Sequence, residues 1–318
     1  MKRIMLGKSG IEVTELCFGA LPMGPLQKNM EDKDAASVLE RALRGGVNFI
    51  DTAQVYSTYR PIKIALDRIG SGLPAPVIAS KCNAEEYGRM EDAVYEALEA
   101  LGRDYIDIFH LHAARGDRTL YQKRSGALKA LCDLQEKGKI RAKGVSGHSP
   151  ELISVSADVK EIDIVFPLIN YTGRGIIGTL DDMTQAIAKC SAAGKGIYLM
   201  KVLAGGNHAE KYGTAMQYAR SLGNYPIALG MISEKEVDYN LAYFNSGNPE
   251  AIPDPTFRDF DKRFHVVKKV CIGCGKCIET CASDAVEFRE EKAFIMEEKC
   301  VMCGYCVESC PVMAIRAL

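Results

Sequence analysis

The most constraining feature of the sequence is a cysteine pattern that occurs twice near its end. The pattern is C-x2-C-x2-C-x3-C, and the second copy follows the first at a constant offset, Cys271 corresponding to Cys300. Two-residue spacing lets one tight loop aim three thiolates at three corners of a [4Fe–4S] cluster, while the fourth cysteine faces the other way. The pattern therefore predicts two clusters with exchanged fourth ligands: Cys271, Cys274, Cys277 and Cys310 for one, and Cys281, Cys300, Cys303 and Cys306 for the other.

The duplicated motif resembles that of the bacterial two-cluster ferredoxins. Gly273, Gly275 and Gly304 suit loops whose backbone N–H groups approach sulfide, and Pro311 follows the last cysteine. Ala282 stands at the equivalent place in the first copy, a departure that should weaken local rigidity but not ligation. A pair of zinc sites is the alternative, although zinc usually uses paired C-x2-C knuckles with a longer gap. Because the start of the chain lacks the apolar core of a signal peptide, the dense set favours metal over disulfides.

Upstream of these cysteines, short apolar runs alternate with amphipathic stretches of helical pattern. The apolar runs lie at residues 13–20, 47–51, 76–82, 105–112, 142–146, 162–170, 196–202 and 226–231. Their mean spacing of about 31 residues is the size of a βα repeat. Two-sided apolar strands indicate a parallel sheet, and eight such units favour a (β/α)8 barrel. An open doubly wound sheet is the alternative, although no G-x-G-x-x-G follows the first strand.

The sequence thus predicts a barrel over residues 1–245, a Pro- and Gly-rich linker over 246–258 and a small α+β ferredoxin-like domain over 259–318. The last segment is too short to form a large apolar core, so its folded structure would depend on bound metal for stability. The 40 basic and 41 acidic residues nearly balance, so no charge excess points to nucleic acid or to an anionic membrane. No apolar run is long enough to span a bilayer, and we expect a cytoplasmic protein.

Four pieces of the first segment resemble the aldo-keto reductase family. They are GGVNFIDTAQVY at 45–56, IASK at 78–81, DYIDIFHLH at 104–112 and KGVSGH at 143–148. The resemblance covers nearly all of residues 1–245 and implies the catalytic tetrad of the family at Asp51, Tyr56, Lys81 and His112. Three of these residues end predicted strands and Tyr56 follows one closely, so all four should lie at the C-terminal mouth of the barrel.

The tetrad suits carbonyl reduction, in which carbon receives hydride while oxygen gains negative charge and a proton. Tyr56 would donate the proton, and Lys81 would lower the tyrosine pKa from its usual value of about 10. Asp51 would hold Lys81, and His112 would orient the carbonyl oxygen. Strand alternation places His110 on the same face as His112, which leaves a joint role open.

The resemblance also implies a nicotinamide cofactor, but the residues that the family uses to bind it are only partly matched here. The asparagine that the family has after its serine is missing after Ser146, and no glutamine lies four residues before Asn170. Tyr171 is a candidate platform under the nicotinamide ring. Segments 200–206 and 230–240 resemble the phosphate and adenine segments of the family. The expected contacts with the cofactor are Gly19, Ser146, Asn170, Lys201, Leu203, Gly205, Gly230, Ser233 and Asn240.

The residues near the expected adenine end bear on the choice of nucleotide. Glu236 falls where the family has an arginine that clamps a 2′-phosphate, and only Lys235 offers a nearby cation. NADH should therefore bind at least as well as NADPH. The loop 56–61 lacks the acidic residue of the family pattern, so the substrate should differ from the usual sugars and aldehydes.

Three functions fit these features. The leading hypothesis is an oxidoreductase that acts on a small carbonyl or alcohol by hydride transfer from NAD(P)H, with Tyr56 as proton donor. Hydride carries two electrons and each cluster moves one, so the second hypothesis omits nicotinamide: the clusters feed single electrons to a substrate in the barrel. The third is a non-enzymatic redox sensor or electron-transfer adaptor. The clusters suggest a ferredoxin or flavoprotein as electron partner, and their absorption should bleach in air.

Overall fold

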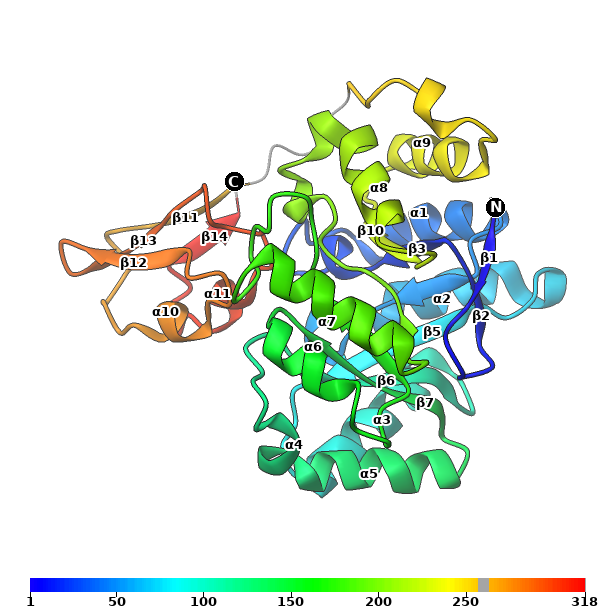
Figure 1. Ribbon diagram of the computed structural model, residues 1–318. Helices are drawn as coiled ribbons and strands as arrows, with labels where there is room; N and C mark the ends of the chain where they lie inside the picture. Colours follow the sequence, from blue (N-terminus) through cyan, green and yellow to red (C-terminus); the bar gives the residue numbers. More distant parts are fainter. Residues whose placement is uncertain (257–262, 318) are drawn as a thin grey trace.

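Eight parallel strands form the centre of the larger part of the chain (Figure 1). The computed structural model describes residues 1–256 and 263–317; the predicted boundary between linker and module, at 258/259, lies outside the described residues. The strands follow the spatial order β10-β3-β4-β5-β6-β7-β8-β9, and a parallel bridge between Leu199 and Ile227 joins the two edges. They are β3 (Leu16–Gly19), β4 (Phe49–Asp51), β5 (Val77–Cys82), β6 (Ile106–Ala113), β7 (Ile140–Gly147), β8 (Ile164–Pro167), β9 (Gly196–Ile197) and β10 (Ile227–Gly230). The predicted barrel is confirmed.

A helix follows each barrel strand and covers the outside of the sheet. The sequence marks several helix starts: Ser149 and Thr179 accept hydrogen bonds from backbone N–H groups of the first turns of α6 and α7. The helices are α1 (Asp32–Arg44), α2 (Tyr59–Ile69), α3 (Tyr87–Leu101), α4 (Leu120–Lys123), α5 (Ser125–Glu136), α6 (Pro150–Ser156), α7 (Leu180–Ala192), α8 (Tyr212–Ser221) and α9 (Glu234–Asn245). Short 3-10 helices lie before, between and after them: η1 (Leu21–Met23), η2 (Gln54–Tyr56), η3 (Gly70–Gly72), η4 (Ala204–Gly206), η5 (Ala209–Lys211) and η6 (Pro249–Ala251).

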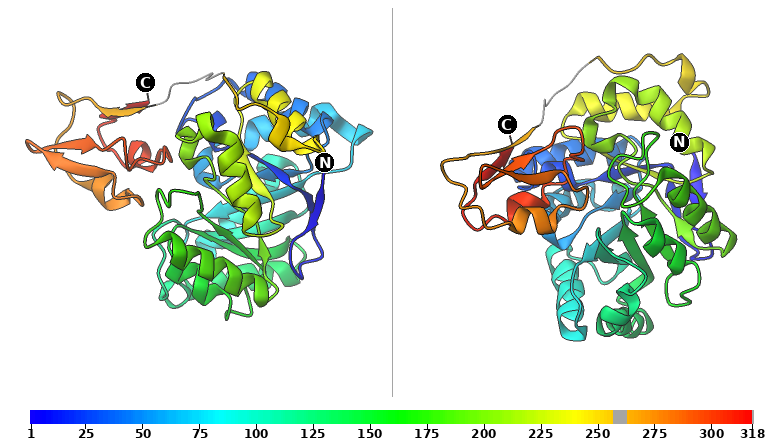
Figure 2. Two further views of the ribbon diagram at one scale, coloured as in Figure 1. Left: turned by 45° about the horizontal axis from the view of Figure 1, so that its top comes forward. Right: turned by 60° about the vertical axis from the view of Figure 1, so that its left-hand side comes forward.

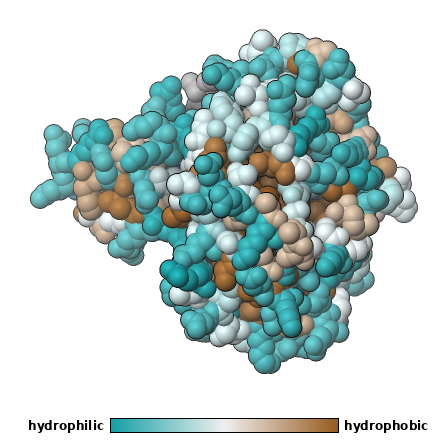
Figure 3. Space-filling model, viewed as in Figure 1, coloured by the Kyte–Doolittle hydropathy of each residue, from teal (hydrophilic) through white to brown (hydrophobic). Residues whose placement is uncertain are grey.

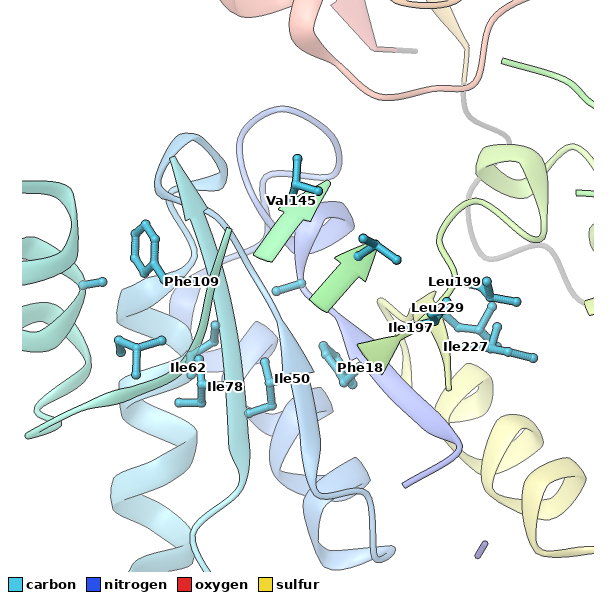
Figure 4. Close-up of a cluster of buried hydrophobic side chains, with 14 of the residues drawn as sticks. Phe18, Ile50, Ile62, Ile78, Phe109, Val145, Ile197, Leu199, Ile227 and Leu229 are labelled. Atoms are coloured by element: carbon cyan, nitrogen blue, oxygen red, sulfur yellow. The ribbon is translucent and has the colours of Figure 1, made fainter. Parts of the chain in front are cut away.

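The barrel has two separate apolar layers because its strands are apolar on both faces. The outer layer packs strands against helices, and Figure 4 shows Phe18, Ile50 and Ile78 of neighbouring strands beside Ile62 of α2. The inner layer fills the barrel with side chains that include Phe166 and Tyr198. Burial on both faces explains why the sequence shows continuous apolar runs rather than alternation.

An N-terminal hairpin that the sequence analysis did not predict covers the floor of the barrel. It pairs β1 (Arg3–Met5) with β2 (Glu12–Thr14), so the predicted first run at 13–20 divides between this hairpin and β3. Leu6, Ile11 and Val13 pack into the inner layer. The Thr14 N–H donates to the Asn48 side-chain oxygen just before β4, and the Lys8 N–H donates to the Gly194 carbonyl just before β9. These contacts place the hairpin at the N-terminal ends of the strands.

The cysteine-rich part forms a small α+β module, as predicted. Its elements are β11 (Phe264–Val266), α10 (Lys276–Thr280), β12 (Val286–Arg289), β13 (Lys292–Ile295), α11 (Tyr305–Glu308) and β14 (Ile315–Ala317), with antiparallel pairs β11–β14 and β12–β13. The duplication is visible in the helices: α10 begins after Gly275 and α11 after Gly304, and both glycines have positive φ, 77° and 84°.

The module lies beside the barrel with α11 toward it (Figures 1 and 2). Hydrophobic residues also show on the module surface in Figure 3, and its exposed apolar side chains include Ile272, Phe288 and Met313. In the described part of the chain, none of the helices combines the length and the apolarity needed to cross a membrane.

Candidate active site

Lys81 and Asp51 form a buried ion pair at the C-terminal ends of β5 and β4. Lys81 Nζ donates hydrogen bonds to both Asp51 oxygens, at 2.6 and 2.8 Å, and to the Thr52 carbonyl at 2.7 Å. The side chains are 1% and 6% exposed. Burial lowers the pKa of Lys81, and the Asp51 carboxylate opposes that shift. The ammonium is thus held in place by three acceptors.

Tyr198 connects this pair to His110. Its hydroxyl donates to Asp51 Oδ2 at 2.9 Å and lies 2.7 Å from His110 Nε2. Burial lowers the pKa of His110 well below its usual value, so its ring is neutral. His110 therefore reaches the tetrad through Tyr198. Tyr198 is not among the predicted site residues, although alternation along 196–202 places it inside the barrel.

Tyr56 and His112 complete the tetrad. Tyr56 lies in η2 just after β4 and is 6% exposed, and its ring centroid is 5.9 Å from that of His112. Lys81 Nζ lies 5.0 Å from the Tyr56 ring centroid. The structure thus brings together all four residues that the resemblance selected.

The expected lowering of the Tyr56 pKa is not found. Burial raises this pKa well above its usual value, and a hydrogen bond with Tyr305 and the charge of Asp51 raise it further. The physical reason is that the Lys81 ammonium is bound by Asp51 and Thr52 rather than by the phenol. The phenol of Tyr56 is therefore protonated at neutral pH.

Tyr305 enters this site from the iron–sulfur module. Its hydroxyl lies 2.6 Å from His112 Nε2, and its ring packs with Tyr56, Leu26 and Ala53. Tyr305 stands between two cysteines of the second motif, Cys303 and Cys306. Burial and the Lys81 charge lower the pKa of His112, so Tyr305 contacts a neutral imidazole. Apart from the cysteine motif itself, no sequence pattern predicts this contact.

The rest of the segment 300–305 also lies on the barrel mouth. Lys201 Nζ donates to the Val301 carbonyl at 3.4 Å, and Gln27 Nε2 donates to the Met302 carbonyl at 2.6 Å. Val301 is fully buried, and a Cβ atom at Gly205 would collide with its carbonyl oxygen. Lys201 and Gly205 belong to the predicted phosphate loop, so that loop is here in contact with the module.

Asn170 and Ser146, two other residues predicted to contact the cofactor, differ in whether their side chains are already engaged in hydrogen bonds. Asn170 is fully used in a turn: Nδ2 donates to the Arg174 and Lys201 carbonyls, and Oδ1 accepts from Thr172 and Arg174. The Ser146 hydroxyl, by contrast, is buried without a hydrogen-bond partner in the described residues. The Ser146 hydroxyl can therefore bind a ligand without rearrangement, whereas the Asn170 side chain would first have to give up hydrogen bonds within its turn.

The remaining predicted contacts lie around the mouth and along α9. Gly19 and Gly230 are register partners at the ends of β3 and β10, and Leu203 is half-buried beside η4. Ser233 caps α9, and the Glu236 carboxylate accepts from the Ile232 N–H at 2.6 Å. Asn240 is bonded to Tyr212 and to the Glu236 carbonyl. The Glu236 carboxylate thus binds an N–H just before α9, and the Glu236 N–H donates to the Ser233 side chain, so Glu236 also has a structural role at this helix start.

The eight cysteines of the module surround two small cavities. One is lined by Cys271, Cys274, Cys277 and Cys310, and the other by Cys281, Cys300, Cys303 and Cys306. This is the exchanged grouping that the spacing predicts. In residues 1–256 and 263–317, no three metal-ligating side chains are arranged to hold a single ion. Four thiols around a cavity fit a cubane cluster, whose iron atoms lie at separate corners.

Barrel, tetrad and module together define an oxidoreductase. The chain belongs to the aldo-keto reductase family: the Aldo/keto reductase family matches residues 15–245, and a 4Fe-4S dicluster domain matches residues 265–317. The predicted family and the predicted iron–sulfur module are thereby confirmed.

Individual relatives each cover part of this chain. L-galactose dehydrogenase of Arabidopsis thaliana is 29% identical over 184 residues, which are 54% of this chain and 56% of that protein. The oxidoreductase YqkF of Bacillus subtilis is 24% identical and covers 76% of this chain and 83% of its own length. An aldo-keto reductase structure from Bacillus halodurans superposes with a TM-score of 0.63 at 19% identity, over 80% of this chain and 92% of that one. At this identity the superposition shows the fold alone.

Proposed function

We propose that the protein reduces a small carbonyl compound to its alcohol at the barrel mouth with single electrons rather than hydride. The observation that carries this proposal is the position of segment 300–305. Tyr305 contacts His112 and Tyr56, and Val301 lies against Lys201. These are the surfaces that the family resemblance assigns to substrate and nicotinamide.

Reduction of a carbonyl to an alcohol takes two electrons and two protons. When bound, [4Fe–4S] clusters exchange one electron each. His112 Nε2 and the Tyr56 hydroxyl, which now contact Tyr305, would hold the carbonyl oxygen once it replaces the Tyr305 hydroxyl. Tyr56 then gives its proton to that oxygen, and solvent supplies the proton that goes to carbon.

The electrostatics of the site support this assignment of roles. The high pKa of Tyr56 keeps the phenol protonated before reaction, and departure of Tyr305 removes one cause of that shift. The Lys81 ammonium lies 5.0 Å from the Tyr56 ring and favours negative charge on the phenol after the proton has left. The neutral His112 ring can donate Nε2–H to the developing oxyanion.

Hydride transfer from nicotinamide is the second candidate. The intact tetrad and the unpartnered Ser146 hydroxyl favour it. It requires segment 300–305 to leave the mouth, because Val301 lies on the predicted phosphate loop. If it operates, the carboxylate of Glu236 beside the adenine segment makes NADH at least as good a ligand as NADPH.

The electron donor in the proposed reaction is a ferredoxin or a flavoprotein. Ile272 and Phe288 are exposed and line the cavity of Cys271, Cys274, Cys277 and Cys310, so a donor has an apolar surface beside that cavity. A reducing compartment such as the cytoplasm suits eight thiols that must bind iron rather than form disulfides.

Anaerobic reconstitution with iron and sulfide, followed by separate additions of NADH, NADPH and reduced ferredoxin, tests the proposal. We expect ferredoxin to bleach the visible absorption, a panel of small carbonyls to restore it, and neither nicotinamide to bind. Tyr56→Phe should block the restoration but not the bleaching, while Tyr95→Phe on the exposed face of α3 should change neither. Binding of either nucleotide with turnover of a carbonyl would establish the hydride mechanism instead.

A further inference from the structure

A cavity of about 180 Å³ opens beside His112, on the connection between β6 and α5. It borders the candidate active site, but no residue of the predicted cofactor set lines it. Its ionisable lining residues are Glu85, His112, Arg115, Asp117, Lys123 and Arg124.

The cations of this cavity lie at different distances from their nearest carboxylates. Arg115 is paired with Asp284 of the module at 2.7 Å, and Lys123 lies 3.4 Å from Asp117. The carboxylate nearest to Arg124 in the described residues is Glu85, at 3.9 Å, and that glutamate is 67% exposed. Because water screens an exposed carboxylate, Glu85 offsets little of the Arg124 charge.

Arg124 is the least exposed of the three cations that line the cavity. Its side chain is 15% exposed, and Nη1 donates to the His112 carbonyl at 2.8 Å. Within residues 1–256 and 263–317, Nη2 has no hydrogen-bond partner. Burial lowers the pKa of Arg124, but a guanidinium stays protonated in proteins. A buried charge with so little neutralisation favours the binding of an anion.

We propose that this cavity binds a carboxylate of the substrate, with Arg124 as the principal contact of that carboxylate. The reacting carbonyl of the substrate, next to its carboxylate, would lie at His112. The inference rests on the proposed function, because that function places the reacting carbonyl at His112. A guanidinium presents parallel N–H groups that match the two oxygens of a carboxylate. The cavity is smaller than the ~300–1,000 Å³ of ordinary ligand pockets. The structure thus assigns the substrate to the short-chain oxo acids.

Calorimetric titration of the reconstituted protein tests the inference without turnover. The probes are pyruvate, its uncharged analogue pyruvamide, and inorganic phosphate. We expect pyruvate to bind at least 10-fold more tightly than pyruvamide, about 1.4 kcal/mol, and phosphate to bind more weakly than pyruvate. Equal binding of pyruvate and pyruvamide, no binding of either, or a preference for phosphate would overturn the carboxylate assignment.

Variants identify the residue responsible. Arg124→Gln should reduce pyruvate binding to the level of pyruvamide, and Arg124→Lys should retain part of the difference. Arg118→Gln is the control, because Arg118 pairs with Glu151 outside the cavity. An unchanged preference in a folded Arg124→Gln protein would exclude this site. If that variant does not fold, the comparison of pyruvate, pyruvamide and phosphate in the unmodified protein still tests the carboxylate assignment. Selective pyruvate binding without reduction would count against the proposed function and leave the subsite standing.

Discussion

Tyr305 Oη and His112 Nε2 are 2.6 Å apart, although the two residues belong to different modules of the chain. Tyr305 lies between two cysteines expected to bind one cluster, and His112 ends a barrel strand. One hydrogen bond therefore joins a predicted cluster loop to a predicted catalytic residue. It acts together with the contacts of Lys201 with Val301 and of Gln27 with Met302, which hold the same segment on the barrel mouth.

Replacing Tyr305 by phenylalanine should loosen segment 300–306 on the barrel. Tyr305→Phe keeps the ring among Leu26 and Ala53 but removes the partner of a buried His112 nitrogen, which costs about 1–3 kcal/mol. Amide hydrogen exchange of 300–306 in the reconstituted protein should accelerate by roughly 5- to 150-fold for this loss. Tyr95→Phe is the control, and exchange unchanged from the unmodified protein would show that the hydroxyl does not hold the segment.

Tyr56→Phe should lower the rate of carbonyl reduction far more than the affinity for ligand. In the proposed reaction the phenol is a positioned proton donor, and loss of such a donor typically costs about 10²–10⁴ in rate. Single-turnover reoxidation after reduction by ferredoxin measures the effect apart from electron entry. Retention of most of the rate would place the donor elsewhere, with His112 or His148 next to be tested.

Acidification should destabilise the barrel through His148. This side chain is buried, and burial with the charge of Lys201 lowers its pKa from 6.5 to about 3. Between these values the unfolded chain binds a proton that the folded chain does not, so stability is present above pH 6.5 and is lost as pH falls. Urea unfolding measures the free energy of unfolding as a function of pH. Between pH 6.5 and 5, His148→Gln should reduce the slope of this free energy against pH by up to ~1.4 kcal/mol per pH unit. Above pH 7 the two slopes should coincide, and equal slopes below pH 6.5 would refute the prediction.

The exchanged cysteine grouping predicts which double variants spare a cluster. Cys271→Ser with Cys310→Ser removes two ligands of one cavity, so iron should fall from about eight to about four per chain. Cys271→Ser with Cys281→Ser affects both cavities, and both clusters should be lost. Iron and acid-labile sulfide assays distinguish the pairs, with Cys132→Ser outside the module as control. The reverse result would mean that each motif keeps its own fourth cysteine.

The barrel and the location of the tetrad follow from local sequence patterns. Buried parallel strands need apolar side chains on both faces, and such runs can be read directly. Asp51 and Lys81 end two of these runs, so the rule that barrel sites lie at strand ends was enough to bring them together. The N-terminal hairpin escaped prediction because its strands have three residues each, too few for a period to show.

The contacts between modules could not be predicted in the same way. Tyr305 and His112 are far apart in sequence, and nothing in either motif signals that they meet. The Tyr56 pKa depends on where the Lys81 ammonium points, which spacing does not determine. Glu236 is predicted to disfavour a 2′-phosphate, and its carboxylate also binds the Ile232 N–H before α9, a contact that the spacing does not reveal. Each of these properties depends on three-dimensional packing rather than on a repeat or a motif.

The hairpin beneath the barrel limits the order of events in a catalytic cycle. Leu6, Ile11 and Val13 fill the lower end of the barrel interior, so a molecule cannot reach Asp51 or Tyr56 from below. Substrate and product must pass on the side where the module is bound, either through the cavity beside His112 or by displacing segment 300–305. In the proposed reaction, electrons would arrive at the same face through which product leaves, so displacement of segment 300–305 would interrupt electron delivery while product is exchanged.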